Sequence, residues 1–270
     1  MTAKHYENFP VASVLLPRRL RQPVSLIYTF ARQADDFADE GDLAADQRLE
    51  LLNGFRAELD RIGAGKTPET TLFGDLAATI AEHHLPLDAF YDLLDAFSQD
   101  VVKTRYASFA EVMQYCRRSA NPVGRLLLHL YGATDRRNLA YSDAICSSLQ
   151  LINFLQDVAI DYKKDRIYLP QDEMEKYNIS ETQIARGDSG GMWSTFMLAQ
   201  IERTRKMLQA GAPLGKILPG RIGLEMRMII MGGESILRKL HKARGDVFQH
   251  RPVLKAGDWV YMLYRSILAR

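Results

Sequence analysis

Two pairs of aspartates stand out as side chains that could do chemistry. Asp35 and Asp39 are four positions apart, and so are Asp157 and Asp161. Residues four apart share one face of a helix, so each pair would place two carboxylates side by side. Like charges at this spacing destabilise an isolated helix by roughly a few tenths of a kcal/mol, and burial without a partner is far less favourable. The pattern therefore indicates a cation between the carboxylates.

The donor atoms indicate which cation this would be. Carboxylate oxygens alone favour Mg2+ or Mn2+ over zinc, and magnesium usually bridges one or two carboxylates to substrate phosphates. Arg32 stands near the first pair and Arg166 near the second, which favours a metal site over a chance pattern. The alternative is a solvated helix face, which a single pair would fit better than two. We expect a Mg2+–diphosphate site whose metal ligands are Asp35, Asp39, Asp157 and Asp161.

The elements that position these carboxylates are expected to be helices. Apolar residues recur at three- and four-residue spacing, as in Val24, Ile27, Tyr28 and Ala31, and strand-like alternation is hard to find. Segments rich in glycine and proline separate stretches long enough for helices, and none of them resembles an interdomain linker. We predict one all-α domain over residues 1–270, with roughly ten helices, some of them apolar on most sides and therefore central.

Composition limits the class of protein. The 270 residues are 47% hydrophobic and 25% charged, which is typical of a globular chain with a substantial core. A net charge of +2 gives no strong field toward nucleic acid, so no nucleic-acid partner is expected. Cys116 and Cys146 have no metal-finger spacing and are expected to be reduced core thiols. With neither a signal peptide nor a membrane-spanning stretch in evidence, we expect a cytoplasmic protein, and peripheral membrane contact stays open.

The sequence around both aspartate pairs resembles the head-to-head prenyl synthases, the family of squalene and phytoene synthases. YTFARQADDFADE (28–40) resembles the first motif of that family, and NFLQDVAIDYKKDRIYLP (153–170) resembles the second. Residues 100–128 resemble the central segment between them, and the resemblance runs from about residue 6 to residue 251. The segments ENFPVASVLLPRRLR (7–21) and FARQADDFADEGD (30–42) most resemble the sequences of bacterial hydroxysqualene synthases of the hopanoid route.

The resemblance implies a fold, a reaction and a set of site residues. The fold would be an isoprenoid-synthase-type helical bundle around a central apolar cavity. The reaction would convert presqualene diphosphate and water to hydroxysqualene and diphosphate with Mg2+. No NADPH is expected, and no glycine-rich dinucleotide motif is present. Catalytic roles are expected for the four aspartates and Tyr115. Substrate binding is expected from Asn8, Phe9, Tyr28, Arg32, Gly124, Gln150, Asn153, Arg166, Tyr168 and Arg251.

The wall of the cavity is expected to come from apolar residues near the motifs. Candidates are Val123, Gly124, Leu127 and Leu128, together with Phe30, Leu149 and Ile152. Gly124 lies among bulky apolar residues, although glycine in a helix interior costs about 1 kcal/mol relative to alanine. We therefore expect its helix to approach the prenyl chain closely. Gln156 stands where several relatives carry an arginine, so one phosphate contact is expected to be missing or supplied elsewhere.

Two other functions remain open at this point. The protein could be another member of the same family, a presqualene diphosphate, squalene or phytoene-type synthase that joins two prenyl diphosphates. It could also be a non-catalytic relative that acts in assembly or lipid binding, although the presence of all four aspartates counts against this. The sequence predicts neither the oligomeric state nor the chain length of the substrate.

Overall fold

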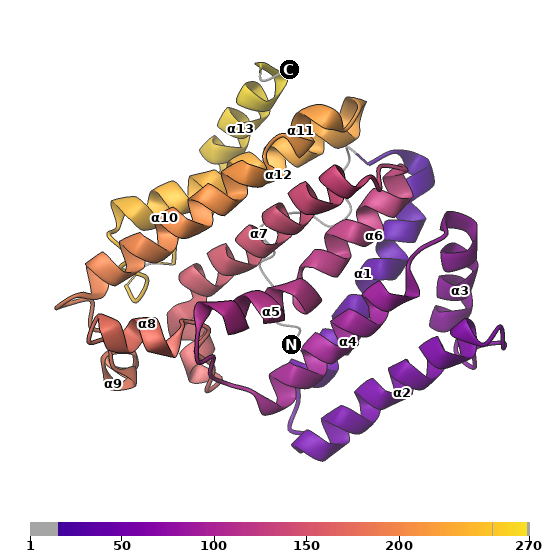
Figure 1. Ribbon diagram of the computed structural model, residues 1–270, viewed down its shortest axis with the longest axis horizontal. Helices are drawn as coiled ribbons and strands as arrows, with labels where there is room; N and C mark the ends of the chain where they lie inside the picture. The colour runs from indigo at the N-terminus through magenta and orange to yellow at the C-terminus, as the bar shows by residue number, and fades with distance from the viewer. Residues whose placement is uncertain (1–15, 250, 269–270) are drawn as a thin grey trace.

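The computed structural model describes residues 16–249 and 251–268, which form an all-α bundle (Figure 1). Within these ranges no strand occurs, and the one β-type contact is a parallel bridge between Arg105 and Ile167. The prediction of an all-α fold is confirmed. The helices are α1 (Arg18–Asp39), α2 (Ala45–Gly63), α3 (Thr71–His83), α4 (Leu87–Val102), α5 (Phe109–Ser119), α6 (Asn121–Tyr131), α7 (Arg136–Lys163), α8 (Gln171–Lys176), α9 (Glu181–Ala185), α10 (Trp193–Gly211), α11 (Leu214–Ile217), α12 (Gly220–Lys242) and α13 (Ala256–Leu268).

The described residues hold thirteen helices, whereas the sequence predicted roughly ten. The difference matches three short helices: α8 has six residues, α9 has five and α11 has four. Apolar periodicity needs a longer window before it can distinguish a helix from a turn, so such single-turn helices escape it. The longer helices carry the aspartates and the core.

The central element of the bundle is α7, which has 28 residues and is therefore about 42 Å long. Figure 1 shows it flanked by α10 and α12 on one side and by α5 and α6 on the other. Because α7 has neighbours on both sides, it buries residues around most of its circumference. At its start the Asp135 carboxylate accepts hydrogen bonds from the backbone N–H groups of Arg137 and Asn138, at 3.0 and 3.1 Å. Its other end carries Asp157 and Asp161.

An aromatic core joins α1 to α2, α3 and α4. The ring of Phe30 lies 5.2 Å from that of Phe90, and the rings of Phe55 and Phe73 are 4.9 Å apart, measured between centroids. Phe30 is fully buried there. The expectation that Phe30 lines a substrate cavity is therefore wrong. It lies two positions from Tyr28, which on a helix turns its side chain to the opposite face of α1.

The end of α1 is held by Arg48 of α2. The Arg48 guanidinium donates hydrogen bonds to the carbonyl oxygens of Phe37, Gly41 and Leu43, at 3.2, 2.6 and 3.0 Å. The last carbonyls of a helix lack partners within the helix and attract positive charge. Arg48 therefore fixes the turn that carries Asp39.

The close approach expected at Gly124 is made toward α7. A Cβ atom at Gly124 would lie 2.3 Å from Ser142 Oγ and 2.6 Å from Cys146 Sγ. Real Cβ atoms do not come so close to other atoms, so glycine is required for α6 to pack on α7. Helix packing thus accounts for the glycine, and the contact of Gly124 with the prenyl chain stays a prediction. Cys146 is half-buried at this contact and Cys116 is buried, and both are free thiols as predicted.

Gly124→Ala is expected to destabilise the protein by about 1–3 kcal/mol, because the new methyl group must displace Ser142 or Cys146. Gly54→Ala is the matched control, since its added Cβ would meet nothing within 4 Å. Removing a glycine from the interior of α2 should leave stability unchanged or raise it by up to about 1 kcal/mol. Urea unfolding of both variants measures the difference. Equal free energies of unfolding would contradict the packing role of Gly124.

Candidate active site

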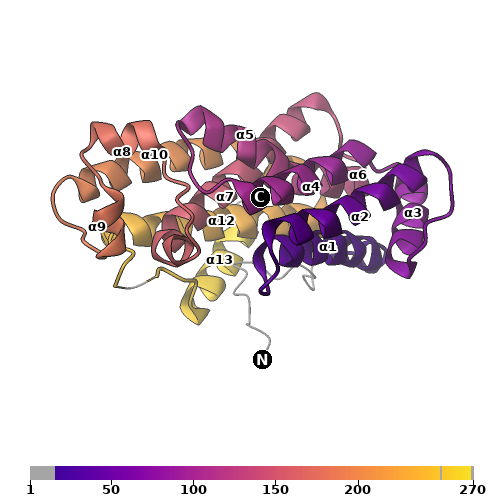
Figure 2. The same cartoon turned by 90° about the horizontal axis from the view of Figure 1, so that it is seen from below.

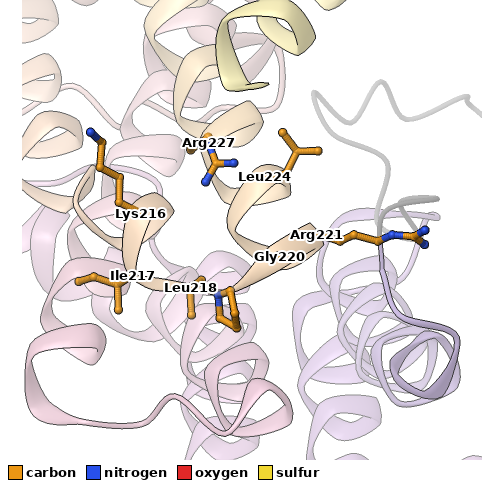
Figure 3. Close-up of a pocket in the computed structure, with 8 residues that line it drawn as sticks. Lys216, Ile217, Leu218, Gly220, Arg221, Leu224 and Arg227 are labelled. Carbon is orange, nitrogen blue, oxygen red and sulfur yellow. The ribbon is translucent and has the colours of Figure 1, made fainter. Parts of the chain in front are cut away.

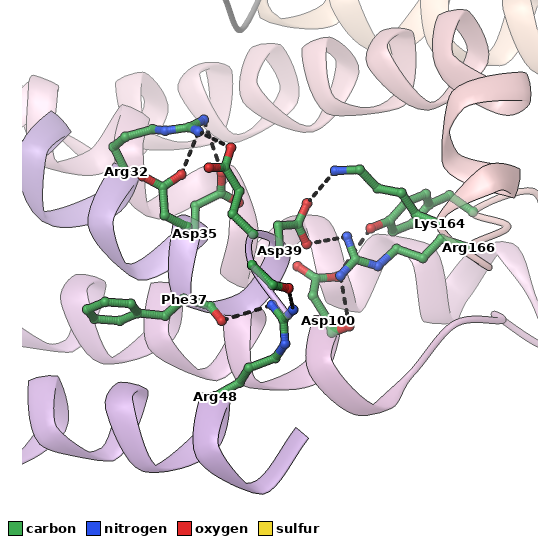
Figure 4. A network of polar contacts seen from close by, with 12 residues as sticks. Arg32, Asp35, Phe37, Asp39, Arg48, Asp100, Lys164 and Arg166 are labelled. Atoms are coloured by element: carbon green, nitrogen blue, oxygen red, sulfur yellow. Dashed lines mark hydrogen bonds and ion pairs between the residues drawn. The ribbon is translucent and has the colours of Figure 1, made fainter. Parts of the chain in front are cut away.

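The ends of α1 and α7 meet, and ion pairs join them (Figure 4). One carboxylate oxygen of Asp39 lies 3.0 Å from Lys164 Nζ and the other lies 2.5 Å from Arg166 Nη1. Both cations follow α7 directly in the sequence. The negative charge of Asp39 also contributes to the raised pKa of Asp161. The structure therefore brings the two aspartate pairs to one end of the bundle.

The first pair sits in an acidic cluster that Arg32 partly neutralises. Arg32 lies 3.4 Å from Asp35, 2.5 Å from Asp36 and 3.0 Å from Glu40. Burial, followed by the charge of Asp39, raises the pKa of Asp35 to about 6. Burial would also raise the pKa of Asp39, but the positive charges that it contacts hold that pKa below its usual value. The two neighbours on one helix face therefore differ in proton affinity.

The second pair lies on a polar face of α7. Arg251 binds both oxygens of Asp157, with Nη2 at 3.0 Å from Oδ2 and Nε closer still to Oδ1. Burial, followed by the charge of Asp157, raises the pKa of Asp161 to about 8. Gln150 and Asn153 precede Asp157 by seven and four positions, so they share its face, and both are half-buried. Gln150, Asn153, Asp157 and Asp161 thus form one row along α7.

Gln156 has a structural role that the sequence did not indicate. Its side chain is buried, and Nε2 donates a hydrogen bond of 2.6 Å to the carbonyl oxygen of Pro252. Pro252 directly follows Arg251, so this bond holds the segment that supplies Arg251 to Asp157. Several relatives carry an arginine at position 156. This chain has a glutamine there, and its amide positions Arg251, which comes from a distant segment.

Asp100 of α4, the first residue of the central segment that resembles the family, is a buried junction. Its carboxylate accepts hydrogen bonds from the hydroxyls of Tyr115 and Tyr168, at 2.6 and 3.2 Å, and its carbonyl oxygen accepts one from Arg166 at 3.0 Å. Burial raises the pKa of Asp100 to about 7, although the Tyr115 hydroxyl and Arg166 oppose this. The ring of Tyr168 stacks on that of Phe154, with centroids 3.8 Å apart. Asp100 thereby links α5 to the arginine that holds Asp39.

Some residues that the sequence assigned to the site do not lie beside the aspartate pairs. Tyr168 and Tyr115 belong to the Asp100 junction, and the catalytic role of Tyr115 stays a prediction. Asn8 and Phe9 lie outside the described residues. Lys164 was missed, although the basic run KKDR after the second aspartate pair was a signal for it.

An apolar cavity of about 230 Å3 lies between α1, α6 and α12. Val123 and Leu127 line it, as predicted, and Tyr28, which was expected to bind substrate, lines it as well. Leu128 is packed in the core instead, and Leu149 and Ile152 pack against Gly233 of α12. The full lining in the described residues is Leu16, Val24, Ile27, Tyr28, Ala31, Val123, Leu127, Tyr131, Ile222, Glu225, Met226 and Ile229.

The cavity and the charged cluster share one face of α1. Tyr28 and Ala31 line the cavity, and Arg32 and Asp35 follow Tyr28 and Ala31 by one turn each. At the cavity itself, burial and then the charge of Glu225 raise the pKa of Tyr131. A ligand with a long apolar part and an anionic end would therefore find both surfaces along a single helix.

The residues at the charged end fit a divalent cation. Over the described ranges, no three side chains of the Asp, Glu, His or Cys type come close enough to hold a metal ion by themselves. The available donors near the two pairs are carboxylate oxygens, which Mg2+ prefers. Burial, followed by the charge of the neighbouring aspartate, raises the pKa of both Asp35 and Asp161. A bound cation would favour the ionised form of both groups.

Metal-free protein is expected to lose stability as the pH rises from about 4 to about 8. Three carboxyls have a folded-state pKa above the unfolded value of 3.8, those of Asp35, Asp100 and Asp161. They therefore bind more protons in the folded state than in the unfolded state. Their contribution is complete below the unfolded pKa and disappears as the pH passes the folded pKa. Thermal unfolding in EDTA between pH 4.5 and 8.5 measures this slope. Asp161→Asn should flatten its upper part, and an unchanged slope would contradict the assignment.

Comparisons with known proteins agree with this geometry. Residues 2–258 match the squalene/phytoene synthase family. The chain is 38% identical over 257 residues to the hydroxysqualene synthase of Rhodopseudomonas palustris, covering 94% of this chain and 85% of that protein. It is 36% identical over 246 residues to the hydroxysqualene synthase of Zymomonas mobilis, covering 87% and 79%.

A solved structure gives the same result for the fold. The squalene synthase HpnC from Alicyclobacillus acidocaldarius is 32% identical, superposes with a TM-score of 0.82, and is matched over 89% of this chain and 90% of that one. The predicted fold and the prediction of an enzyme are both confirmed. Sequence, fold and the joined motifs agree: this chain belongs to the squalene/phytoene synthase family of enzymes.

Proposed function

We propose that the enzyme converts presqualene diphosphate and water to hydroxysqualene and diphosphate, with Mg2+ as cofactor. The observation that carries the proposal is the arrangement along α1, where an apolar cavity is followed within one turn by carboxylates and an arginine. The substrate has the same two parts, apolar prenyl chains and a diphosphate. Two relatives named hydroxysqualene synthase support this choice of reaction.

The proposed chemistry begins with the departure of diphosphate. Asp35, Asp39, Asp157 and Asp161 would hold Mg2+, which when bound supplies positive charge to the leaving oxygens. Arg32, Lys164 and Arg166 add fixed positive charge at the same end, and the guanidinium forks suit phosphate oxygens. Such preorganised charge favours the departure of an anion.

The apolar cavity has the second role in this proposal. Loss of diphosphate leaves a carbocation, which must rearrange before water adds to it. Val123, Leu127 and Ile229 line the cavity with side chains that offer water no hydrogen-bonding partner. Apart from Tyr28, the polar groups of the lining are Tyr131 and Glu225. We expect the added water to be held by these two groups.

The competing activity is that of a synthase joining two prenyl diphosphates. To separate the two, purified protein is incubated with Mg2+ and either presqualene diphosphate or farnesyl diphosphate, in the absence of NADPH. We expect hydroxysqualene and diphosphate from the first substrate and no C30 product from the second. Presqualene diphosphate or a phytoene-type product formed from the second substrate would establish the competing activity. EDTA should abolish turnover if Mg2+ is the cofactor.

A further inference from the structure

The last helix of the described chain carries large apolar side chains in solvent. Along α13, Val260 is 71% exposed, Tyr264 is 62% exposed, and Leu263 and Tyr261 are 44% and 42% exposed. Val260 and Tyr264 are four positions apart and share one side of the helix. The other side packs on α12 through the fully buried Met262 and Ser266. Seen edge-on, α13 stands out from one face of the bundle (Figure 2).

Positive charge surrounds this apolar side. The guanidinium carbons of Arg238 and Arg265 lie 5.6 and 5.9 Å from the centroid of the Tyr261 ring. Both arginines are exposed, and neither forms an ion pair with a carboxylate of the described residues. Asp258 is the acidic residue of α13, and it lies 2.5 Å from Lys239. The face of α13 is therefore apolar at its centre and basic at its edge.

A basic groove adjoins the end of α13 (Figure 3). It has a volume of about 600 Å3, and Lys216, Arg221 and Arg227 supply charged side chains to its lining, with no carboxylate from the described residues. Exposed Ile217 also lines it. Arg227 donates hydrogen bonds to the carbonyl oxygens of Ser266, at 2.9 Å, and of Gly215, at 2.6 Å. These bonds tie the end of α13 to the groove, and we call the two together the α13 surface.

The α13 surface lies behind the apolar cavity. Met226 and Ile229 of α12 line the cavity, and Met231 on the next turn lies 3.2 Å from Ser266, measured from Sδ to Oγ. The same helix therefore contributes one side to the cavity and another to the support of α13. A partner bound to α13 would lie one helix away from the cavity.

We propose that the α13 surface docks on a membrane with anionic headgroups. Aliphatic and tyrosine side chains bordered by arginine and lysine are the combination that binds the boundary between headgroups and acyl chains. Basic residues add electrostatic attraction to anionic lipids. None of the helices in residues 16–249 and 251–268 is long and apolar enough to span a bilayer. The contact is therefore interfacial, and it brings the cavity close to lipid.

Sedimentation with vesicles tests the proposal without any substrate. The full chain is mixed with vesicles of phosphatidylcholine alone or with phosphatidylglycerol added, at low and high salt. We expect the partition coefficient to rise with phosphatidylglycerol and to fall with salt. Val260→Ser combined with Leu263→Ser and Tyr264→Ser should lower it by about tenfold or more, because each side chain loses its apolar contact with lipid. Arg238→Gln with Arg265→Gln should weaken the preference for anionic vesicles.

Matched controls make the result specific to α13. Leu43, Val102 and Met192 are 42%, 66% and 46% exposed on other parts of the surface, and their joint replacement by serine should leave partition unchanged. Tyr264→Ser alone replaces the triple variant if circular dichroism shows that the latter is unfolded. Diphosphate release in detergent micelles should be the same for wild type and α13 variants, which separates this proposal from the proposed reaction.

Three outcomes would overturn the proposal. The first is a wild-type protein that does not sediment with anionic vesicles, and the second is an α13 variant that sediments as well as wild type. In the third, wild type is a dimer that the α13 variant converts to a monomer while neither binds vesicles. That result would assign the α13 surface to a second copy of the chain.

Discussion

Asp35→Asn is expected to lower kcat by roughly a hundredfold or more while leaving the helical fold intact. The substitution removes a carboxylate that would hold Mg2+, and it removes one member of a like-charged pair on α1. Because burial and Asp39 make the ionised form of Asp35 unfavourable in metal-free protein, losing that charge should not lower the stability measured in EDTA. Diphosphate release at saturating Mg2+ and thermal unfolding in EDTA are the two measurements.

Asp36→Asn is the control for this experiment. Asp36 is the next residue and also pairs with Arg32, at 2.5 Å, but it lies about 100° away around the helix. Its replacement should leave kcat within about a few fold, since surface ion pairs contribute little. Full turnover by Asp35→Asn, or an equal loss in both variants, would contradict a metal-holding role specific to Asp35.

Arg166→Gln is the second substitution with a large expected effect, a loss of about a hundredfold in kcat. Arg166 holds Asp39 with one nitrogen and the carbonyl oxygen of Asp100 with another, so its removal frees both groups at once. Arg166→Lys keeps the charge but has a single nitrogen, so we expect an intermediate loss. Steady-state kinetics measures the effect of each variant on catalysis, and inhibition by inorganic diphosphate measures its effect on anion binding.

Arg105→Gln provides the comparison for Arg166. Arg105 also lies beside the second motif, where it binds Glu181 at 2.8 Å and Asp165 at 2.9 Å. These bonds tie loops to α9 and do not involve the predicted ligands, so this variant should lose stability with little change in the inhibition constant of diphosphate. If Arg166→Gln behaved in the same way, Arg166 would be a structural residue only.

Local patterns predicted the features that depend on one helix at a time. The spacing of Asp157 and Asp161 predicted a shared face, and the apolar periodicity around Tyr28 predicted α1, because both depend only on helix geometry. The site residues found in the structure alone depend on contacts between distant helices. Lys164 is an example, since its partner Asp39 lies on α1, and the partners of Asp100 likewise come from α5 and from the segment after α7.

The predictions that the structure changes also depended on contacts between distant helices. Gly124 was correctly taken as a point of close approach, but the sequence cannot tell whether a ligand or another helix is the neighbour. Phe30 was assigned to the cavity because it is apolar and near the motif, yet α1 has apolar neighbours on more than one side. Which side faces the cavity is decided by the packing of α6 and α12, elements about a hundred and two hundred residues away in sequence.

The ion pair between Asp39 and Lys164 joins residues that are 125 positions apart. Closing so long a loop is entropically unfavourable, and contacts between distant segments form slowly compared with helices. The aspartates of α1 therefore emerge from the ribosome long before the cations that accompany them are synthesised. Until α7 is complete, that acidic turn depends on Arg32 and Arg48, the two nearby arginines that are made within ten residues of it. Early synthesis thus leaves the site unfinished until α7 and the two cations that follow it have been made.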